Sequence, residues 1–213
     1  QSRLDREIPA LLDLIAGGRF SGKDRYNVAV YYEADRISFS QIYPFLHYAE
    51  EFKRRFNAEF RFRHVAKILA DPGAIIEGAD AVILQSWFQT DEDRLKRAAG
   101  AVRAGAKRVA FLDAMAPTDL RLARIVDDYI DFYIKKSVLK DESLYFRPMR
   151  GDTNLEEYYG LLYGLAVEPV DWRTPPGFLS KLKLGPNFFT APPLIRGFED
   201  GARPPALGRN IDL

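Results

Sequence analysis

The sequence predicts an α/β fold: a doubly wound, mostly parallel sheet of about five or more strands, of the Rossmann or flavodoxin kind, with a Pro/Gly-rich C-terminal extension. Apolar runs alternate with helical patterns up to Lys136, and three of these runs are apolar almost throughout, as in strands covered on both faces. Residues that interrupt helices and strands are concentrated after Lys136: the last 77 of the 213 residues contain 9 of the 13 prolines and 8 of the 15 glycines.

The first elements follow from apolar spacing. Residues 1–25 contain an N-terminal helix, whose pattern stops at Gly17-Gly18. Residues 26–32 are a nearly continuous apolar run and predict a strand. A long helix follows, and we expect Pro44 in its first turn, where the missing N–H is tolerated. The strict alternation of residues 60–65 predicts a half-buried strand.

Three further strands are expected at residues 80–86, 108–113 and 130–135. Between the first two, Thr90 followed by three acidic residues predicts a helix with Thr90 as N-cap, ending at Gly105. A short helix is expected at 118–127. We therefore divide the chain into an N-terminal helix (1–25), a Rossmann-like domain (26–165) and a strap or inter-domain linker (166–213).

Composition excludes several function classes. The chain has no Cys, which excludes disulfide scaffolds, Cys-based zinc sites and thiol nucleophiles. A formal net charge of +1 gives no electrostatic reason to expect nucleic acid. No apolar run is long enough to span a membrane, although peripheral membrane contact stays open, and no signal peptide is visible, so a cytoplasmic location is expected. The missing initial Met leads us to expect an excerpt of a longer protein.

Cofactor motifs are also missing. The loop after the first strand lacks the glycines that let a dinucleotide pyrophosphate approach, and no P-loop or Gly-x-Ser-x-Gly elbow occurs. His47 and His64 have no third ligand at matching spacing, so we expect no metal and no cofactor. A receiver domain is rejected because Asp113 follows the fourth strand rather than the third.

Ligands of open α/β sheets bind beyond the carboxyl ends of the strands. The candidate loops are therefore those that follow the first, third, fourth and fifth predicted strands. The catalytic candidates are acids able to take a proton from a hydroxyl group: Asp113, Asp35 and Glu33. The substrate-binding candidates in or next to these loops are Ser38, Ser86, Trp87, Asp119, Arg121, Lys135 and Lys136. Each type has a structural alternative: hydroxyl groups and acids cap helices or turns, aromatic side chains pack beneath helices, and charges are solvated.

Asp152 and Asn154 precede an aromatic-rich helical stretch. They are candidates for binding sugar hydroxyl groups, and the alternative is that one of them caps the helix.

Residues 111–121, 131–136 and 150–155, together with 80–86 and 209–213, resemble the N-terminal half of bacterial GT-B glycosyltransferases. The resemblance implies two facing Rossmann-like domains, of which the N-terminal one binds the acceptor and the C-terminal one the nucleotide-sugar donor. Nothing after Leu213 supplies a second such domain. We therefore expect an acceptor-side domain from carbohydrate biosynthesis that transfers a sugar to a hydroxyl acceptor only together with a donor domain outside this chain.

If transfer inverts the anomeric configuration, Asp113, Asp35 or Glu33 would serve as the base, whereas a retaining mechanism needs none. Lys135, Lys136 or Arg121 would stabilise phosphate charge. The alternative function is a stand-alone, non-catalytic flavodoxin-like domain that binds a sugar or a protein partner.

Overall fold

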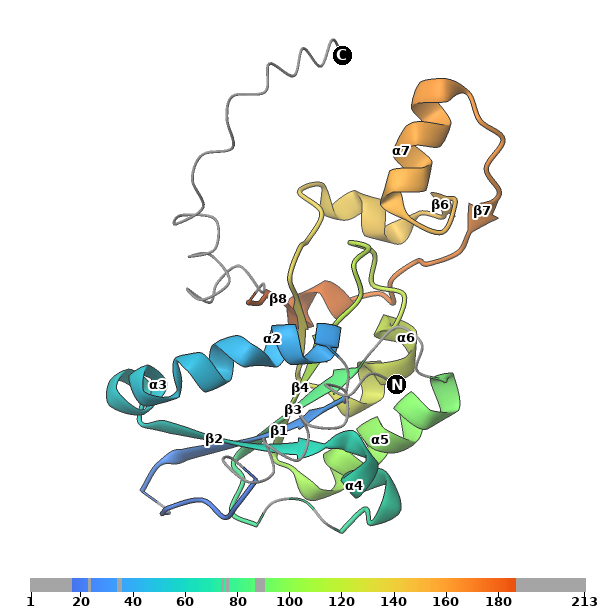
Figure 1. The fold of residues 1–213 in the computed structure, drawn as a ribbon. Coiled ribbons are helices and arrows are strands. Elements are labelled where there is room, and N and C mark those ends of the chain that lie inside the picture. Colours follow the sequence, from blue (N-terminus) through green and yellow to red (C-terminus); the bar gives the residue numbers. More distant parts are fainter. Residues whose placement is uncertain are drawn as a thin grey trace, which may run out of the picture.

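The structure is a computed structural model that describes residues 17–22, 24–33, 36–73, 75, 77–86 and 91–186. Its centre is a six-stranded sheet in the order β2-β1-β3-β4-β5-β8, in which every neighbouring pair is parallel (Figure 1). The predicted doubly wound α/β fold is confirmed. The expected N-terminal helix and the C-terminal residues from 187 onward lie outside the described residues.

The first five strands lie where the sequence predicted strands, and β8 was not predicted. The strands of the sheet are β1 (Tyr26–Tyr32), β2 (Ala58–His64), β3 (Ala81–Ser86), β4 (Arg108–Asp113), β5 (Phe132–Lys135) and β8 (Leu182–Leu184). β1 lies between β2 and β3, so the strand order reverses there and creates a topological switch point.

Helices cover both faces of the sheet (Figure 1). On one face lie α2 (Arg36–His47) and α3 (Ala49–Phe56), and Ile42 and Phe45 of α2 pack in the same core cluster as Val30 of β1. On the other face lie α4 (Val65–Ala70), α5 (Glu92–Gly105), α6 (Ala123–Val126) and the 3-10 helix η1 (Asp127–Tyr129). This cover is why three of the strands read as apolar throughout.

Some local predictions were wrong. The helix after β1 begins at Arg36, so Pro44 lies in its interior rather than its first turn, and the helix ends three residues later at His47. Asp91, not Thr90, caps α5, since its carboxylate accepts a hydrogen bond of 2.8 Å from the Arg94 N–H. The expected helix at 118–127 is reduced to α6, which η1 extends.

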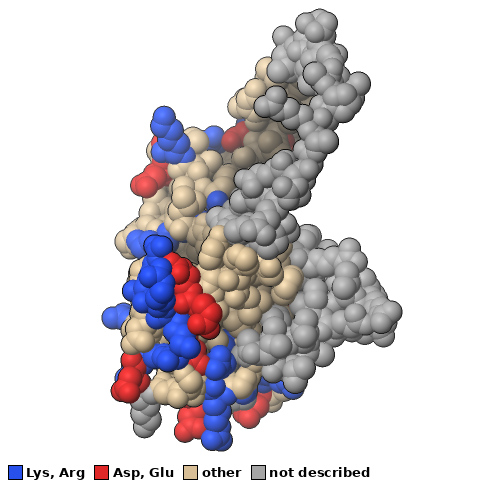
Figure 2. All heavy atoms as spheres, turned by 60° about the vertical axis from the view of Figure 1, so that its left-hand side comes forward, with Lys and Arg blue, Asp and Glu red and all other residues tan. Residues whose placement is uncertain are grey.

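Charges on the face that carries α3 are mixed in sign (Figure 2). The carboxylate of Glu51 pairs with the guanidinium groups of both Arg54 and Arg55. The basic side chains of this helix are therefore partly neutralised by their own neighbours.

Residues 138–173 form a small lobe beyond the carboxyl ends of β4 and β5 (Figure 1). It consists of the 3-10 helix η2 (Glu142–Phe146), β6 (Met149–Arg150), α7 (Asn154–Tyr163) and β7 (Pro169–Val170), and β6 pairs antiparallel with β7. No helix among the described residues is long and apolar enough to cross a membrane.

The chain returns from the lobe through the 3-10 helix η3 (Phe178–Lys181) to β8. Phe178 is buried against Tyr133, with ring centroids 5.2 Å apart, and β8 pairs with β5. The region 166–213, expected as a strap, thus contributes one strand to the sheet.

Candidate functional site

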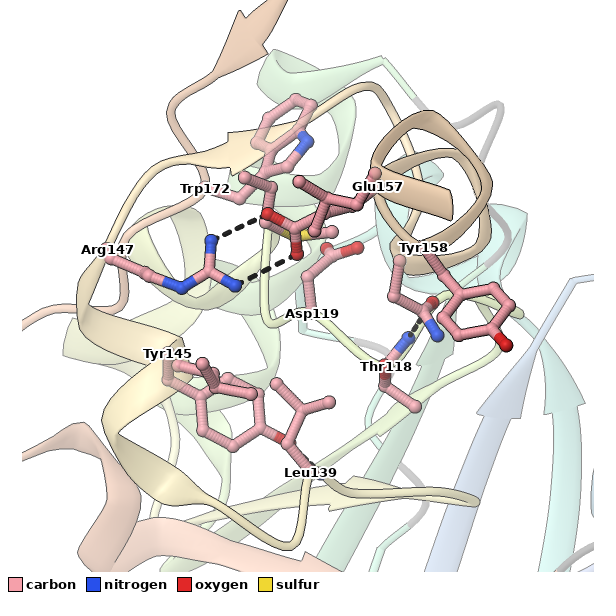
Figure 3. Close-up of a pocket in the computed structure, with 12 residues that line it drawn as sticks. Thr118, Asp119, Leu139, Tyr145, Arg147, Glu157, Tyr158 and Trp172 are labelled. Carbon is pink, nitrogen blue, oxygen red and sulfur yellow. Dashed lines mark hydrogen bonds and ion pairs between the residues drawn. The ribbon is translucent and has the colours of Figure 1, made fainter. Parts of the chain in front are cut away.

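A cavity of about 240 Å³ lies between the loop after β4 and the lobe (Figure 3). Most of its wall is apolar or aromatic. The lining residues are Thr118, Asp119, Leu139, Leu144, Tyr145, Arg147, Met149, Asn154, Glu157, Tyr158, Leu161 and Trp172. It lies beyond the carboxyl end of β4, on the edge of the sheet where ligands of such folds bind, two strands away from the switch point at β1.

Two polar atoms of this wall have no partner. The Thr118 hydroxyl oxygen and the Trp172 indole nitrogen are both buried and make no hydrogen bond within the described structure. Buried polar groups are nearly always hydrogen-bonded, so an unpaired hydroxyl and an unpaired N–H beside one cavity indicate a place for a polar group of a ligand. Figure 3 shows the two residues on different sides of the cavity, so a ligand would meet them with separate groups: one hydroxyl group could accept from Trp172 and another could pair with Thr118.

The lobe side of the cavity is held by charged pairs. Arg147 donates to the two carboxylate oxygens of Glu157 at 2.6 and 3.0 Å (Figure 3). Hydrogen bonding from Arg147 is the main reason that the pKa of Glu157 lies below its usual value. The amide oxygen of Asn154 accepts a long bond of 3.5 Å from the Thr118 N–H and so connects α7 to the loop after β4.

Arg121 joins two residues of the cavity wall, Asp119 and Trp172. Its guanidinium donates to both carboxylate oxygens of Asp119 at 2.8 and 2.9 Å, donates to Asp152 at 2.9 Å, and stacks 4.4 Å over the Trp172 ring. Burial works against the charge of Arg121, but the hydrogen bonds and charge of Asp119 outweigh it, and the pKa of Arg121 is raised.

Asp113 and Lys135 form a fully buried ion pair at the ends of β4 and β5. The Lys135 ammonium and the Tyr133 hydroxyl each donate to Asp113 Oδ2 at 2.6 Å, and the Met115 N–H donates to Oδ1 at 2.7 Å. Both charged side chains are 0% exposed. Burial, with the adjacent Asp113 carboxylate, raises the pKa of Tyr133 well above 10, so this hydroxyl stays a donor. The network fixes the start of the loop that leads to Thr118.

Lys136 is half-buried beside this network, and its ammonium makes no ion pair within the described structure. Burial, and then the charge of Lys135, lower the pKa of Lys136 below 10.5. A lysine whose pKa is lower in the folded than in the unfolded chain opposes folding when charged, and this penalty disappears as pH rises toward 10.5.

We therefore expect Lys136→Met to raise the urea midpoint at pH 7, and to raise it less at pH 10. Unfolding curves of both proteins at the two pH values measure this difference. An equal effect at both pH values would contradict the assignment of the penalty to the charge.

Glu33, just after β1, is held by neighbours on β2, β3 and α5. Arg94 lies 2.9 Å from it and His64 4.0 Å, and the Glu33 N–H donates to the Gln85 side-chain oxygen at 2.9 Å. Glu33 does not line the cavity.

The structure thus brings Asp119 and Asn154 to the cavity wall, and Arg121 with Asp152 directly beneath it. It places Asp113, Lys135 and Lys136 at the strand ends nearby. Ser38 is buried on α2. Ser86 forms the end of β3, in register with Asp113, and its side chain lies outside the described residues, as do Asp35 and Trp87. Thr153, rather than Asp152 or Asn154, caps α7.

Sequence reasoning missed several residues. Trp172, Thr118 and Glu157 line the cavity, but they come from segments that no local motif connects. Gln41 and Gln85 are buried at 3% and 0% exposure, and the Gln41 amide and the Gln85 Nε2 have no partner within the described structure. Gln41 lies three residues after Ser38 on the inward stripe of α2, so polar residues in an otherwise apolar stripe were the available signal.

No cluster of three or more His, Cys, Asp or Glu side chains able to hold a metal occurs among the described residues. Comparison of the chain with protein families, curated proteins and solved structures gives no match.

Proposed function

We propose that the chain is the acceptor-side domain of a GT-B-type glycosyltransferase from bacterial, cytoplasmic carbohydrate biosynthesis, and that the cavity binds the acceptor. The observation that carries the proposal is the pair of unpartnered polar atoms, on Thr118 and Trp172, in an otherwise largely apolar wall. A glycosyl acceptor is defined by its hydroxyl groups, which would accept a hydrogen bond from Trp172 or pair with Thr118.

The composition of the wall narrows the acceptor. Leu139, Leu144 and Met149 surround most of the space, while Asp119 and Glu157 are already occupied by arginines. Such a site favours an alcohol or glycoside with an apolar portion over a free sugar, because a fully hydroxylated ligand would leave many groups unpaired.

The donor would bind elsewhere. The cavity offers no Gly-rich loop and no free cationic pair for a diphosphate, since Arg147 is bound to Glu157 and Arg121 to Asp119. We assign the nucleotide-sugar to a domain outside this chain, and the isolated chain would bind acceptor without transferring sugar. Which of Asp113, Asp35 and Glu33 would be the base stays a prediction, because neither Asp113 nor Glu33 lines the cavity.

Intrinsic fluorescence tests the proposal. The chain has two tryptophans, so Trp87→Phe leaves Trp172 in the cavity wall as the reporter. We expect hexyl β-D-glucoside to give a saturable change, glucose a much weaker one and UDP-glucose none. Leu144→Phe, which fills the cavity, should weaken hexyl glucoside binding at least tenfold, and Thr118→Val should weaken it about fivefold through loss of one hydrogen bond.

Leu162→Phe is the matched control, because Leu162 is exposed on α7 and does not line the cavity. It should leave binding unchanged. Saturable UDP-glucose binding that Leu144→Phe abolishes would make this a donor site and overturn the acceptor assignment. If no glycoside binds, the proposal that the cavity is the acceptor site would be wrong.

The second candidate is a non-catalytic flavodoxin-like domain that binds a partner. One observation favours it: the described part of the chain exposes a large apolar surface on α7, independent of the cavity's polar atoms. The same titration separates the two candidates, because a pure interaction domain would bind no glycoside at Trp172.

A further inference from the structure

The helix α7 is mounted with its polar side against the protein. Glu157 is half-buried and accepts from Arg147, whereas Glu156 is exposed and accepts from the Asp152 N–H at 2.5 Å. Gly160 is the one buried residue of the helix, and a side chain there would collide with Val167. The inward side of α7 is therefore small and charged, the reverse of an ordinary amphipathic helix.

The outward side is apolar. Its side chains are between 47% and 67% exposed: Leu155, Tyr158, Tyr159, Leu161, Leu162 and Tyr163. At about 100° per residue, five of these positions, from Tyr158 around the helix to Tyr163, cover an arc of about 140°, wider than the stripe of about 100° that a surface helix usually buries, whereas Asn154 separates Leu161 from this arc. α7 also lies at the outer end of the lobe, away from the sheet (Figure 1). A flat protein surface would cover only part of such an arc, whereas a fluid phase surrounds a protruding helix.

The exposed apolar area is too large to be incidental. With Leu165, which is 57% exposed and follows the helix, it amounts to roughly 700 Å², against about 300–600 Å² for the largest patch on a typical monomer. A patch of this size marks an interaction surface.

The order of residue types across the arc indicates what covers it. Leu155 and Leu162 lie at its centre, with Tyr158 on one flank and Tyr159 and Tyr163 on the other. Tyrosine has an apolar ring and a polar hydroxyl and is enriched where hydrocarbon meets water at membrane surfaces. Leucines flanked on both sides by tyrosines match a helix lying in that boundary.

Charge selects the kind of membrane. The lobe, residues 138–173, has four basic and seven acidic residues, so it does not attract an anionic surface. The basic residues are Lys140, Arg147, Arg150 and Arg173, and the acidic ones are Asp141, Glu142, Asp152, Glu156, Glu157, Glu168 and Asp171.

We propose that α7 binds the surface of a zwitterionic lipid bilayer through apolar insertion, with Leu155 and Leu162 below the headgroups. Tyr158 belongs both to this face and to the cavity wall, so the cavity lies beside the bound bilayer. An apolar acceptor would then reach the cavity from the lipid, a consequence that rests on the proposed function, whereas membrane binding itself does not.

Vesicle flotation of the full chain tests this. We expect the wild type to float with phosphatidylcholine vesicles, with little change in high salt and no gain when phosphatidylglycerol is added. Leu155→Ser/Leu162→Ser should lower the fraction bound at least tenfold, since each leucine contributes the free energy of its burial. Both residues are more than half exposed, so the variant keeps the fold, which circular dichroism checks.

Leu184→Ser is the matched control, because Leu184 is 69% exposed on β8 and outside the lobe. It should float like the wild type, as should Leu144→Phe, while the double serine variant should keep its glycoside binding. Comparing vesicle binding and glycoside binding of these variants distinguishes failure of the membrane proposal from failure of the acceptor assignment. No flotation with phosphatidylcholine, or flotation only with anionic lipid, would overturn the proposal, as would a dimer in sedimentation velocity that the serine variant abolishes without any vesicle binding.

Discussion

Asp113→Asn is expected to destabilise the folded chain by about 3–5 kcal/mol, because it leaves the Lys135 ammonium buried without a counter-charge. Both partners are 0% exposed and their charged atoms lie 2.6 Å apart. The neutral amide also replaces an acceptor of three hydrogen bonds with a group that has a single acceptor oxygen. Urea unfolding followed by circular dichroism measures the loss.

A compensated variant distinguishes a lost charge pair from a general packing defect. Asp113→Leu combined with Lys135→Met should recover most of the loss, because replacing a buried ion pair with apolar residues is often neutral or stabilising. Asp171→Asn is the surface control: the Asp171–Arg173 pair is more than half exposed, and its removal should change stability by less than about 0.5 kcal/mol. A loss in Asp113→Asn no larger than in this control would refute the account.

The same substitution bears on catalysis. If Asp113 is the base of an inverting transferase, Asp113→Asn should lower turnover 10²-fold or more in a protein that includes the donor domain. The rate has to be expressed per folded molecule, since the structural loss alone lowers the active fraction. A near-wild-type rate per folded molecule would leave Asp113 with the structural role only.

Arg121→Met is expected to cost about 2–4 kcal/mol and to loosen the cavity wall. The substitution leaves the Asp119 carboxylate, at 4% exposure, without its two charge-assisted bonds, and it frees Asp152 and Trp172 from the guanidinium that joins them. Arg121→Lys should not restore stability, because one ammonium cannot bind two carboxylates and stack on an indole together.

Urea midpoints and the emission of Trp172 measure the two consequences separately. Arg124→Met is the matched control, since Arg124 and its partner Glu92 are 57% and 63% exposed. It should shift the midpoint by an amount equivalent to less than about 0.5 kcal/mol. Unchanged stability in Arg121→Met together with normal glycoside binding would show that the Arg121 contacts do not support the cavity.

Much of the fold could be predicted because it depends on short-range patterns. The runs that became β1, β3 and β4 are long and apolar, and the buried residues of α5, Leu95, Ala98, Ala99 and Val102, recur at helical spacing. β8 could not be predicted: it is three residues long, lies among prolines and becomes a strand only because the edge of β5 is open to pair with it.

Some residues of the candidate site could likewise be predicted from the sequence, and others could not. Asp119 and Asn154, which the sequence offers as candidates because they follow a strand end or begin a helix, line the cavity. The cavity itself could not be predicted, because Leu139, Glu157 and Trp172 meet only after the lobe folds back over the loop that follows β4.

The sequence by itself determined the parallel sheet, its helical cover and the absence of cysteine chemistry, because each depends on residue types and spacings along the chain. The tertiary structure decided which charges are paired and which polar atoms are not. Asp113 reads as a strand-end acid in the sequence, yet its carboxylate is enclosed by Lys135 and Tyr133 from the neighbouring strand. The stretch that forms α7 reads as an ordinary aromatic-rich helix, and only the ion pair of Glu157 and the burial of Gly160 reveal that its apolar side faces outward.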